Sequence, residues 1–210
     1  MNQFRVYIRD MNMQGSRKYE MKARSESAAQ TEANILKAAG ELWMKYPLHE
    51  ITLERIAEKA ETTVRTVLRK FGSREGVFEA AIGQDVAGIE AIKDAAKVGD
   101  LPLAVDLLMQ EYEATGEAAV RTLALEHTLP IIAEVLQHAR KIHTAWCARV
   151  FAPYLPSESD PNYRLLLGMY YASTDVNQWK LLRKDLGYSQ EETAQILFQR
   201  LNAITLIKMS

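Results

Sequence analysis

The sequence of 210 residues predicts an all-α protein, with a group of short helices near the N-terminus and a longer helical bundle after it. Over most of the chain, apolar residues recur at intervals of three and four, as they do along one face of a helix. No segment shows the strict alternation of apolar and polar residues that is typical of a strand. Proline and glycine stand where these helical patterns stop. The chain is also long enough to bury a sizeable core.

Three short helices are expected in the first 80 residues. Residues 1–27 show no sustained helical period, so we expect a flexible basic arm there. A continuous apolar stripe follows and ends near Pro47, because the residue before a proline disfavours helical geometry. Thr52 is a good N-cap for a second helix, and Thr63 for a third that runs to about residue 70. Gly72 suits the position just after that third helix.

The sequence after residue 80 predicts longer helices that are separated by glycine and proline. The breaks fall at Gly99 and Pro102, at Gly116, near Pro130, at Pro153 to Pro156 and at Gly187. We expect helices at about 74–95, 101–115, 117–125, 128–153, 161–185 and 189–207.

Composition limits the class of protein. The formal net charge is -1, and the apolar and charged fractions are those of a globular protein. No stretch approaches the length and apolarity of a membrane span. The single cysteine, Cys147, excludes an internal disulfide and fits a reducing compartment. The N-terminal residues lack the apolar core of a signal peptide, so we expect a cytoplasmic protein.

Positive charge is concentrated in the N-terminal part. Residues 1–80 carry 14 Lys and Arg against 11 Asp and Glu, a net charge of +3, and the rest of the chain carries -4. Arg65, Arg69, Lys70 and Arg74 fall within ten residues, and Glu75 is the first acid after them. This distribution favours an anionic partner for the N-terminal part.

Three short helices with a tight turn before the third describe a helix-turn-helix, whose third helix lies in the major groove of DNA. Arginine can pair with guanine in two hydrogen bonds, whereas threonine, lysine and helix N-termini mainly contact methyl groups and phosphates. A solvated charged face and plain helix caps are the alternatives. The candidate DNA-binding residues are Thr52, Thr63, Arg65, Thr66, Arg69, Lys70, Arg74 and, in the arm, Arg24.

This region resembles TetR-type (TetR/AcrR family) transcriptional regulators. The resemblance rests on ILKAAGELW, ITLERIAEKA and TTVRTVLRKFGSREGVF. It implies a homodimer with a helix-turn-helix DNA-binding domain at 28–80 and a ligand-binding and dimerisation domain at 81–210. Two features depart from the family. Glu61 stands where the turn usually carries glycine, and Leu68, Arg69 and Lys70 stand where the family often has two aromatics and a histidine.

The C-terminal half offers candidates for a ligand pocket and a dimer interface. Aromatic and polar-tipped residues on different helices can line a pocket, although most such residues in a bundle are core. The candidates are Met109, Tyr112, His143, Trp146, Cys147 and Tyr170, with Phe151 and Tyr171 beside them. Gly83 and Gly88 allow the helix at 74–95 to bend, or serve close packing. The helices at 161–185 and 189–207 are expected to pair across a two-fold axis.

The function expected from these features is a ligand-responsive repressor that binds a palindromic double-stranded DNA operator as a homodimer and is released by a small molecule. The alternative is a DNA-associated adaptor whose C-terminal helices bind another protein. An enzyme is not expected, because the sequence shows no phosphate loop or nucleophile motif. No cofactor is expected, and no metal, since His143 with Cys147 supplies too few ligands.

Overall fold

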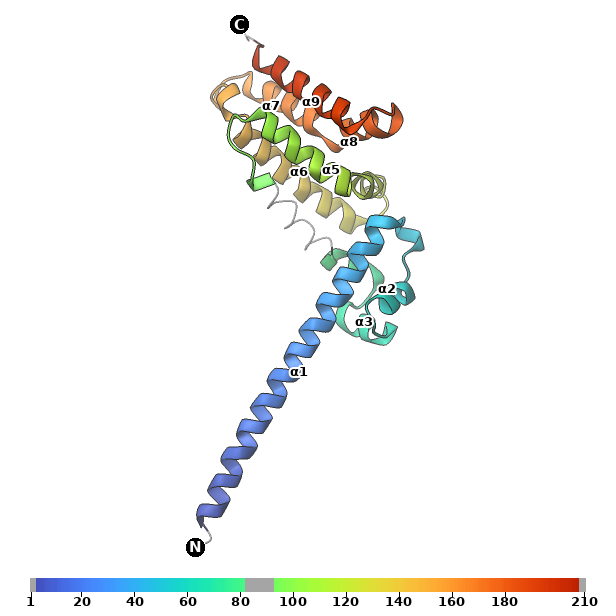
Figure 1. Cartoon of the computed structure of the whole chain (residues 1–210), viewed down its shortest axis with the longest axis vertical. Coiled ribbons are helices and arrows are strands. Elements are labelled where there is room, and N and C mark those ends of the chain that lie inside the picture. The colour runs from blue at the N-terminus through green and yellow to red at the C-terminus, as the bar shows by residue number, and fades with distance from the viewer. Residues whose placement is uncertain (1–2, 82–92, 208–210) are drawn as a thin grey trace. The chain divides into compact units, whose positions relative to one another are not determined.

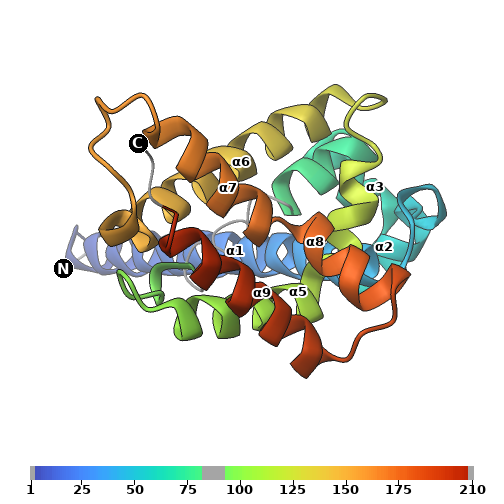
Figure 2. The ribbon, with the colours of Figure 1, turned by 90° about the horizontal axis from the view of Figure 1, so that it is seen from above.

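The computed structural model describes residues 3–81 and 93–207, and of the side chains before Ser25 it describes only that of Lys22. Every regular element in these ranges is a helix, which confirms the all-α fold (Figures 1 and 2). The chain divides into two compact units. Unit 1 comprises Met1–Leu42 with Leu48–Ala81, and unit 2 comprises Trp43–Pro47 with Ile82–Ser210. Each unit is described by itself.

Unit 1 is built from a long helix and the short helices that pack on it. α1 spans Gln3–Lys45, α2 spans Leu53–Lys59 and α3 spans Val64–Phe71. A single 3-10 turn, Leu48–Glu50, precedes α2, and a further helix begins at residue 74 and is described to residue 81. The core of this unit is apolar and fully or almost fully buried, with Ile35, Ala39, Ile51, Ile56, Val67, Val77 and Phe78 at its centre.

The expected arm over residues 1–27 is corrected by the structure, because α1 is helical from Gln3 onward. The segment contains many good helix formers, such as Met, Gln, Arg, Lys and Glu, and no proline. The helix that the apolar stripe predicts after residue 27 therefore meets no proline on its N-terminal side. Once the helix is nucleated, each added residue gains a backbone hydrogen bond. Sequence periodicity missed this extension because residues 1–27 show no sustained apolar repeat.

The turn between α2 and α3 places a glutamate in left-handed backbone geometry. Glu61 has a φ of 52°, the one positive φ of a non-glycine residue in the described ranges. The Thr62 N–H donates to the Ala57 carbonyl at 2.9 Å, and the Glu61 N–H donates to the Glu58 carbonyl at 3.1 Å. This is the hydrogen-bond pattern of a Schellman motif, which usually has glycine at the left-handed position. The chain therefore keeps the usual turn geometry without the usual glycine.

Replacing Glu61 with glycine is expected to raise the free energy of unfolding by about 1 kcal/mol, because a Cβ in this geometry costs about 1–2 kcal/mol. Urea denaturation measures the change. Glu61→Ala is the control, since alanine removes the carboxylate but keeps the Cβ. An alanine variant as stable as the glycine variant would show that side-chain charge, rather than backbone strain, limits this turn.

Unit 2 is a bundle of longer helices. α5 spans Leu101–Leu123 and α6 spans Pro130–Val150, followed by a 3-10 turn at Ala152–Tyr154. α7 spans Tyr163–Thr174, α8 spans Val176–Lys180 and continues into a π-helical turn at Leu181–Asp185, and α9 spans Gln190–Thr205. α8 and α9 both pack against α5, and α9 also packs against α7. The side chains of Trp179, Tyr170, Phe151, Leu108, Leu197 and Leu201 form the fully buried centre.

Two expected helix boundaries in unit 2 were wrong. The break at Gly116 does not exist, because α5 passes through it. Gly116 lies against the indole of Trp179, and a Cβ there would come within 2.5 Å of Trp179 Cζ3. Conversely, the single helix expected at 161–185 is divided at Asp175, whose backbone is extended and whose side chain accepts from the Asn177 N–H at 2.9 Å. The Asp-Val-Asn sequence was a cap signal that the apolar pattern concealed.

Gly116→Ala is expected to destabilise unit 2 by about 1–3 kcal/mol, because the added methyl overlaps a buried ring that has no room to move. Helix propensity alone predicts the opposite sign, a gain of up to about 1 kcal/mol. Gly168 in α7 is the matched control. Its Cβ would meet no atom within 4 Å, so Gly168→Ala should be stabilising. Thermal unfolding of the two variants compares the signs, and a gain in both would contradict the close packing of Gly116 on Trp179.

One further expectation concerns the segment that connects the two units. Gly83 and Gly88, the candidate bend positions, lie outside the described residues. No helix in the described ranges is both long and apolar enough to cross a membrane.

Candidate functional site

α3 turns one face into the core of unit 1 and the opposite face outward. Val67 is completely buried, whereas Arg65 and Arg69 are exposed and Thr66 is half-buried. Neither arginine forms a hydrogen bond or ion pair with any residue of the described ranges. Thr66 and Arg69 also line an open hollow between α1 and α3, together with Ser27, Ala28, Thr31, Thr62 and Lys70. The outward face of α3 therefore presents two uncommitted guanidinium groups and a hydroxyl.

Lys70 is placed differently from the phosphate-contacting role that the sequence suggested. Its Nζ donates to the Ala28 carbonyl at 2.8 Å and to Glu32 Oε2 at 3.2 Å, and its side chain is 14% exposed. Both partners belong to α1. Lys70 thus ties the C-terminal end of α3 to the first helix.

The other DNA-binding candidates make mainly local contacts. Thr52 Oγ1 accepts from the Arg55 N–H at 3.3 Å, and Thr63 Oγ1 accepts from the Thr66 N–H at 3.2 Å, so both threonines cap helices. The Arg74 guanidinium donates to Glu75 Oε1 from Nε at 3.2 Å and from Nη2 at 3.1 Å. Arg24 lies in α1, and its side chain is outside the described residues.

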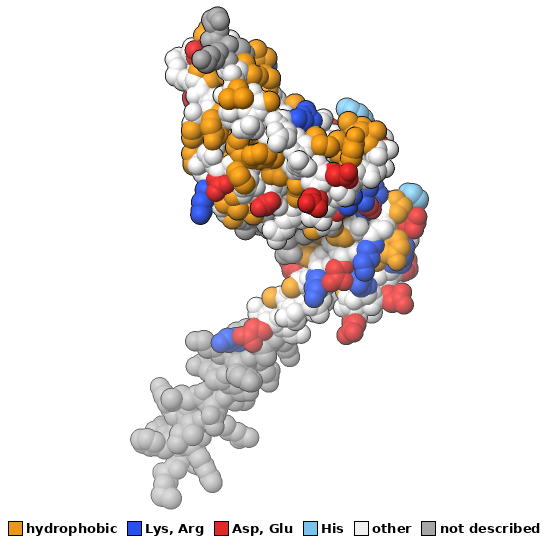
Figure 3. Space-filling model, turned by 45° about the horizontal axis from the view of Figure 1, so that its top comes forward, with side chains coloured by type: hydrophobic (Ala, Val, Ile, Leu, Met, Phe, Trp, Pro, Cys, Tyr) orange, Lys and Arg blue, Asp and Glu red, His pale blue; other side chains and the backbone are white. Residues whose placement is uncertain are grey.

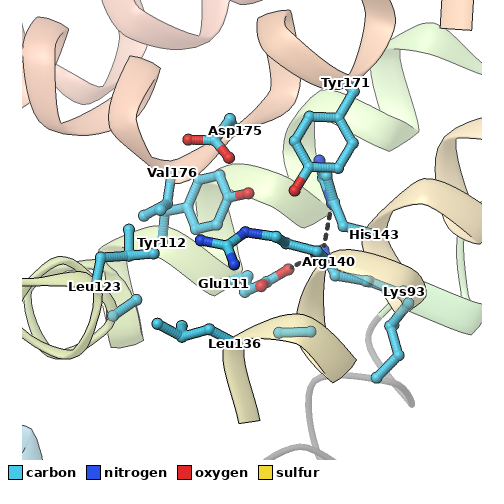
Figure 4. Close-up of a pocket in the computed structure, with 13 residues that line it drawn as sticks. Lys93, Glu111, Tyr112, Leu123, Leu136, Arg140, His143, Tyr171, Asp175 and Val176 are labelled. Atoms are coloured by element: carbon cyan, nitrogen blue, oxygen red, sulfur yellow. Dashed lines mark hydrogen bonds and ion pairs between the residues drawn. The ribbon is translucent and has the colours of Figure 1, made fainter. Parts of the chain in front are cut away.

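Unit 2 contains a half-open pocket of about 160 Å³ (Figure 4). Its walls come from α5, α6, the end of α7 and the start of α8, and they are mainly apolar. Charged and hydroxyl groups are set into these walls. The lining residues are Lys93, Glu111, Tyr112, Ala119, Leu123, Leu136, Ala139, Arg140, Ile142, His143, Tyr171, Asp175 and Val176.

A chain of buried hydrogen bonds forms the deep side of the pocket. Lys93 Nζ donates to Glu111 Oε2 at 2.9 Å and to His143 Nδ1 at 3.3 Å. Because Nδ1 accepts, the proton of a neutral His143 is on Nε2, which lies 2.9 Å from Thr174 Oγ1. The Thr174 hydroxyl donates in turn to the Tyr170 carbonyl at 2.8 Å. Both side chains of the Lys93–Glu111 ion pair are only 8% exposed.

The environment of His143 keeps its imidazole neutral. Burial, and secondarily the positive charge of Lys93, lower the pKa of His143 to about 3. The ring stacks on Trp146, with centroids 5.5 Å apart, and meets the edge of Tyr171 at 4.8 Å. His143 therefore acts here as a hydrogen-bond relay between Lys93 and Thr174 and carries no charge at neutral pH.

This lowered pKa predicts a loss of stability in mild acid. Between the unfolded pKa of about 6.5 and the folded value, the unfolded chain binds more protons, so the stability that neutral His143 contributes is present above pH 6.5 and is lost as the pH falls. The slope is up to about 1.4 kcal/mol per pH unit. Urea denaturation at several pH values should show a shallower slope in His143→Gln. The exposed His138 on the same helix gives the control, His138→Gln, which should retain the slope of the parent protein.

The six predicted ligand residues separate into two groups. Tyr112 and His143 line the pocket. Met109, Trp146, Cys147 and Tyr170 belong to the buried core of unit 2 and do not line this pocket. Burial raises the pKa of the Cys147 thiol to about 12, so the thiol is unreactive at neutral pH.

Sequence reasoning missed the charged residues of the pocket, Lys93, Glu111, Arg140 and Asp175. One signal was present for Glu111. It follows Leu108 by three residues and Ala104 by seven, so it falls on the buried stripe of α5. A carboxylate on an apolar stripe indicates a buried partner, but its partner, Lys93, lies 18 residues away. No group of three or more residues able to hold a metal ion occurs in the described part of the chain.

Comparisons with known proteins give the class of this chain. Residues 35–81, which contain α2 and α3, match the family described as bacterial regulatory proteins, tetR family. A search of curated proteins found no match. Solved structures with a similar fold include a transcriptional regulator from Rhodococcus sp. Rha1, with 17% identity over 85% of this chain and 95% of that chain and a TM-score of 0.64.

Two further solved structures share the fold at low identity. A TetR-family transcriptional regulator from Mesorhizobium loti MAFF303099 has 14% identity over 84% of this chain and 96% of that chain, with a TM-score of 0.62. Salmonella enterica GusR has 20% identity over 84% and 96% of the two chains, with a TM-score of 0.60. These likenesses show a shared fold, in which α2 and α3 form a helix-turn-helix with an outward-facing cationic surface on α3. The match over residues 35–81 assigns the segment that contains α2 and α3 to the bacterial regulatory proteins of the tetR family.

Proposed function

We propose that the protein is a cytoplasmic repressor that binds a palindromic operator as a homodimer and leaves it when a small molecule occupies the pocket of unit 2. The observation that carries the proposal is the outward face of α3, where Arg65 and Arg69 are exposed and paired with no described residue. Their guanidinium groups are suited to bidentate pairing with guanine in the major groove. Thr52 and Thr63 cap their helices, and their helix N-termini suit DNA phosphates.

Exposed apolar side chains in the C-terminal helices support the dimer. Leu165 on α7 is 56% exposed, and Leu206 and Ile207, just beyond α9, are 73% and 38% exposed. Figure 3 shows apolar side chains spread over much of unit 2. A second copy that covers α7 and α9 would bury them and form a four-helix bundle. Two recognition helices in such a dimer are expected about 34–36 Å apart, one helical turn of DNA.

The pocket supports release by a small molecule. It combines apolar walls with a few fixed polar groups, which is the usual make-up of a ligand site. It lies in unit 2, whereas the DNA-binding face lies in unit 1, so the two sites of an allosteric regulator are distinct. The pocket also favours this function over the adaptor, which requires a surface for a protein and no cavity.

Fluorescence anisotropy of the full chain on DNA from upstream of its own gene tests the proposal. Binding that resists unrelated competitor DNA and weakens steeply with salt is the expected result. The molecular mass measured in solution should be that of a dimer, and two copies of the chain should bind each operator. Equal, weak binding to operator-region and unrelated DNA would contradict self-regulation through this face and would favour the adaptor.

A further inference from the structure

The two cations that line the pocket of unit 2 are engaged in ion pairs, whereas each of its two carboxylates keeps an oxygen with no donor among the described residues. We propose that its ligand is an amphiphilic cation, an ammonium group on an apolar or aromatic body. This inference rests on the proposed function, since it specifies the class of effector for the same pocket.

Both cations of the pocket are already engaged. Lys93 Nζ donates to Glu111 and to His143, and it lies 5.2 Å from the centroid of the Trp146 ring. Arg140 makes a two-pronged ion pair with Glu126, with Nη1–Oε1 at 2.5 Å and Nη2–Oε2 at 2.6 Å. A ligand carboxylate would have to share a cation that already has a carboxylate partner, Lys93 with Glu111 or Arg140 with Glu126.

The carboxylates, in contrast, have unused oxygens. Glu111 is 94% buried, and only its Oε2 is hydrogen-bonded within the described residues, which leaves Oε1 as an acceptor on the pocket wall. Asp175 Oδ1 accepts from the backbone and side-chain amides of Asn177 at 2.9 and 2.7 Å, and Oδ2 accepts from none of the described residues. A carboxylate oxygen that has no protein donor, in a pocket with mainly apolar walls, favours a ligand that brings a donor.

Aromatic rings surround these acceptors. Tyr112 and Tyr171 line the pocket with Asp175 and Glu111 (Figure 4). The Tyr112 hydroxyl donates to the Thr174 carbonyl at 2.7 Å, so it offers only its lone pairs to a ligand. The negative faces of aromatic rings attract ammonium groups, most strongly where water is excluded. Tyr112, Tyr171 and the two carboxylates therefore form one acceptor-rich wall.

The formal charge of the site agrees with a cationic ligand. Of the lining residues, Lys93 and Arg140 supply two positive charges and Glu111 and Asp175 two negative ones; Glu126, which pairs with Arg140 but does not line the pocket, adds one more negative charge. The opposite part of the pocket, formed by residues such as Leu123, Leu136, Ile142 and Val176, is apolar. A monovalent cation with an apolar body would neutralise the first part and fill the second.

Three probes with the same phenylpropyl body test the class of ligand: 3-phenylpropylamine, 3-phenylpropanoate and 3-phenylpropanol. Isothermal titration calorimetry on the full chain at neutral pH should show the amine binding at least about 10-fold more tightly than the acid or the alcohol. Equal or tighter binding of the acid overturns the inference, as does an amine that does not bind at millimolar concentration.

A pair of variants assigns the binding to Asp175. Asp175→Asn keeps a good N-cap for α8 but removes the charge, and it should weaken the amine about 10-fold without affecting the alcohol. Asp100→Asn is the matched control, because Asp100 caps α5 through its Oδ1, 3.0 Å from the Leu103 amide, and does not line the pocket. Unchanged binding of the amine to Asp175→Asn would overturn the proposed site.

An experiment with DNA distinguishes a failure of this inference from a failure of the proposed function. Each probe is added to the protein on its operator, and anisotropy records release. Release by the acid alone would leave the proposed function intact and overturn the cationic class of ligand. Failure of the protein to bind any operator would contradict the proposed function, while calorimetry would still decide which probe the pocket prefers.

Discussion

Replacing Lys93 with methionine is expected to lower the free energy of unfolding by about 3–5 kcal/mol, because it leaves the buried carboxylate of Glu111 without its cation. The two atoms of the pair, Lys93 Nζ and Glu111 Oε2, lie 2.9 Å apart in a site from which water is largely excluded. His143 also loses the donor to its Nδ1. Urea denaturation measures the loss. An equal dependence of the unfolding free energy on urea concentration in the variant and the parent protein would show that both unfold with similar cooperativity.

The double variant Lys93→Met, Glu111→Leu is the informative control. It removes both charges and replaces them with apolar groups of similar size, so we expect a stability within about 1 kcal/mol of the parent protein. Such a result would mean that the ion pair is kept for the ligand site rather than for stability. A double variant as unstable as the single one would contradict this and would assign the pair a net stabilising role.

Replacing Arg65 and Arg69 together with alanine is expected to weaken operator binding about 30-fold or more, because each guanidinium that pairs with a base contributes about 1–3 kcal/mol. Both side chains are exposed and form no bond within the described residues, so the fold should not change. Circular dichroism and thermal unfolding verify the fold, and fluorescence anisotropy gives the affinity.

The lysine versions of the same substitutions separate charge from base recognition. Arg65→Lys with Arg69→Lys keeps both positive charges but loses the planar, bidentate geometry. Non-specific binding should then remain near that of the parent, while the preference for operator over unrelated DNA falls. Full operator specificity in the lysine variant would mean that these residues contact only phosphates. Full operator affinity in the alanine variant would exclude this face of α3 from the interface.

Much of the fold was accessible from the sequence, because its helices follow local rules. Thr52 and Thr63 were recognised as caps from their side chains, and the structure shows each accepting the expected backbone hydrogen bond. Errors arose where tertiary packing overrode a local signal. Glycine has a low helix propensity, yet α5 continues through Gly116. The indole of Trp179 packs there in the space that a Cβ would occupy.

The pocket was far less accessible than the fold. Tyr112 and His143 were identified as aromatic residues with polar tips, but the property that distinguishes the site is a set of paired and unpaired charges. Lys93 and His143 are 50 residues apart in the sequence, and no local pattern announces that they meet. Lys70 shows the same limit in unit 1, where a lysine in a cationic run is bonded to a glutamate 38 residues earlier.

The bond from Lys70 to α1 has a consequence for how the regulator can be switched. Because Lys70 holds the end of α3 to Ala28 and Glu32, the helix proposed to contact DNA is fixed against α1 in the absence of DNA. A helix fixed in this way gives the effector little opportunity to act by fraying or unwinding it. We therefore expect the effector to leave the internal geometry of unit 1 intact. It should act by changing the distance between the two recognition helices of the proposed dimer.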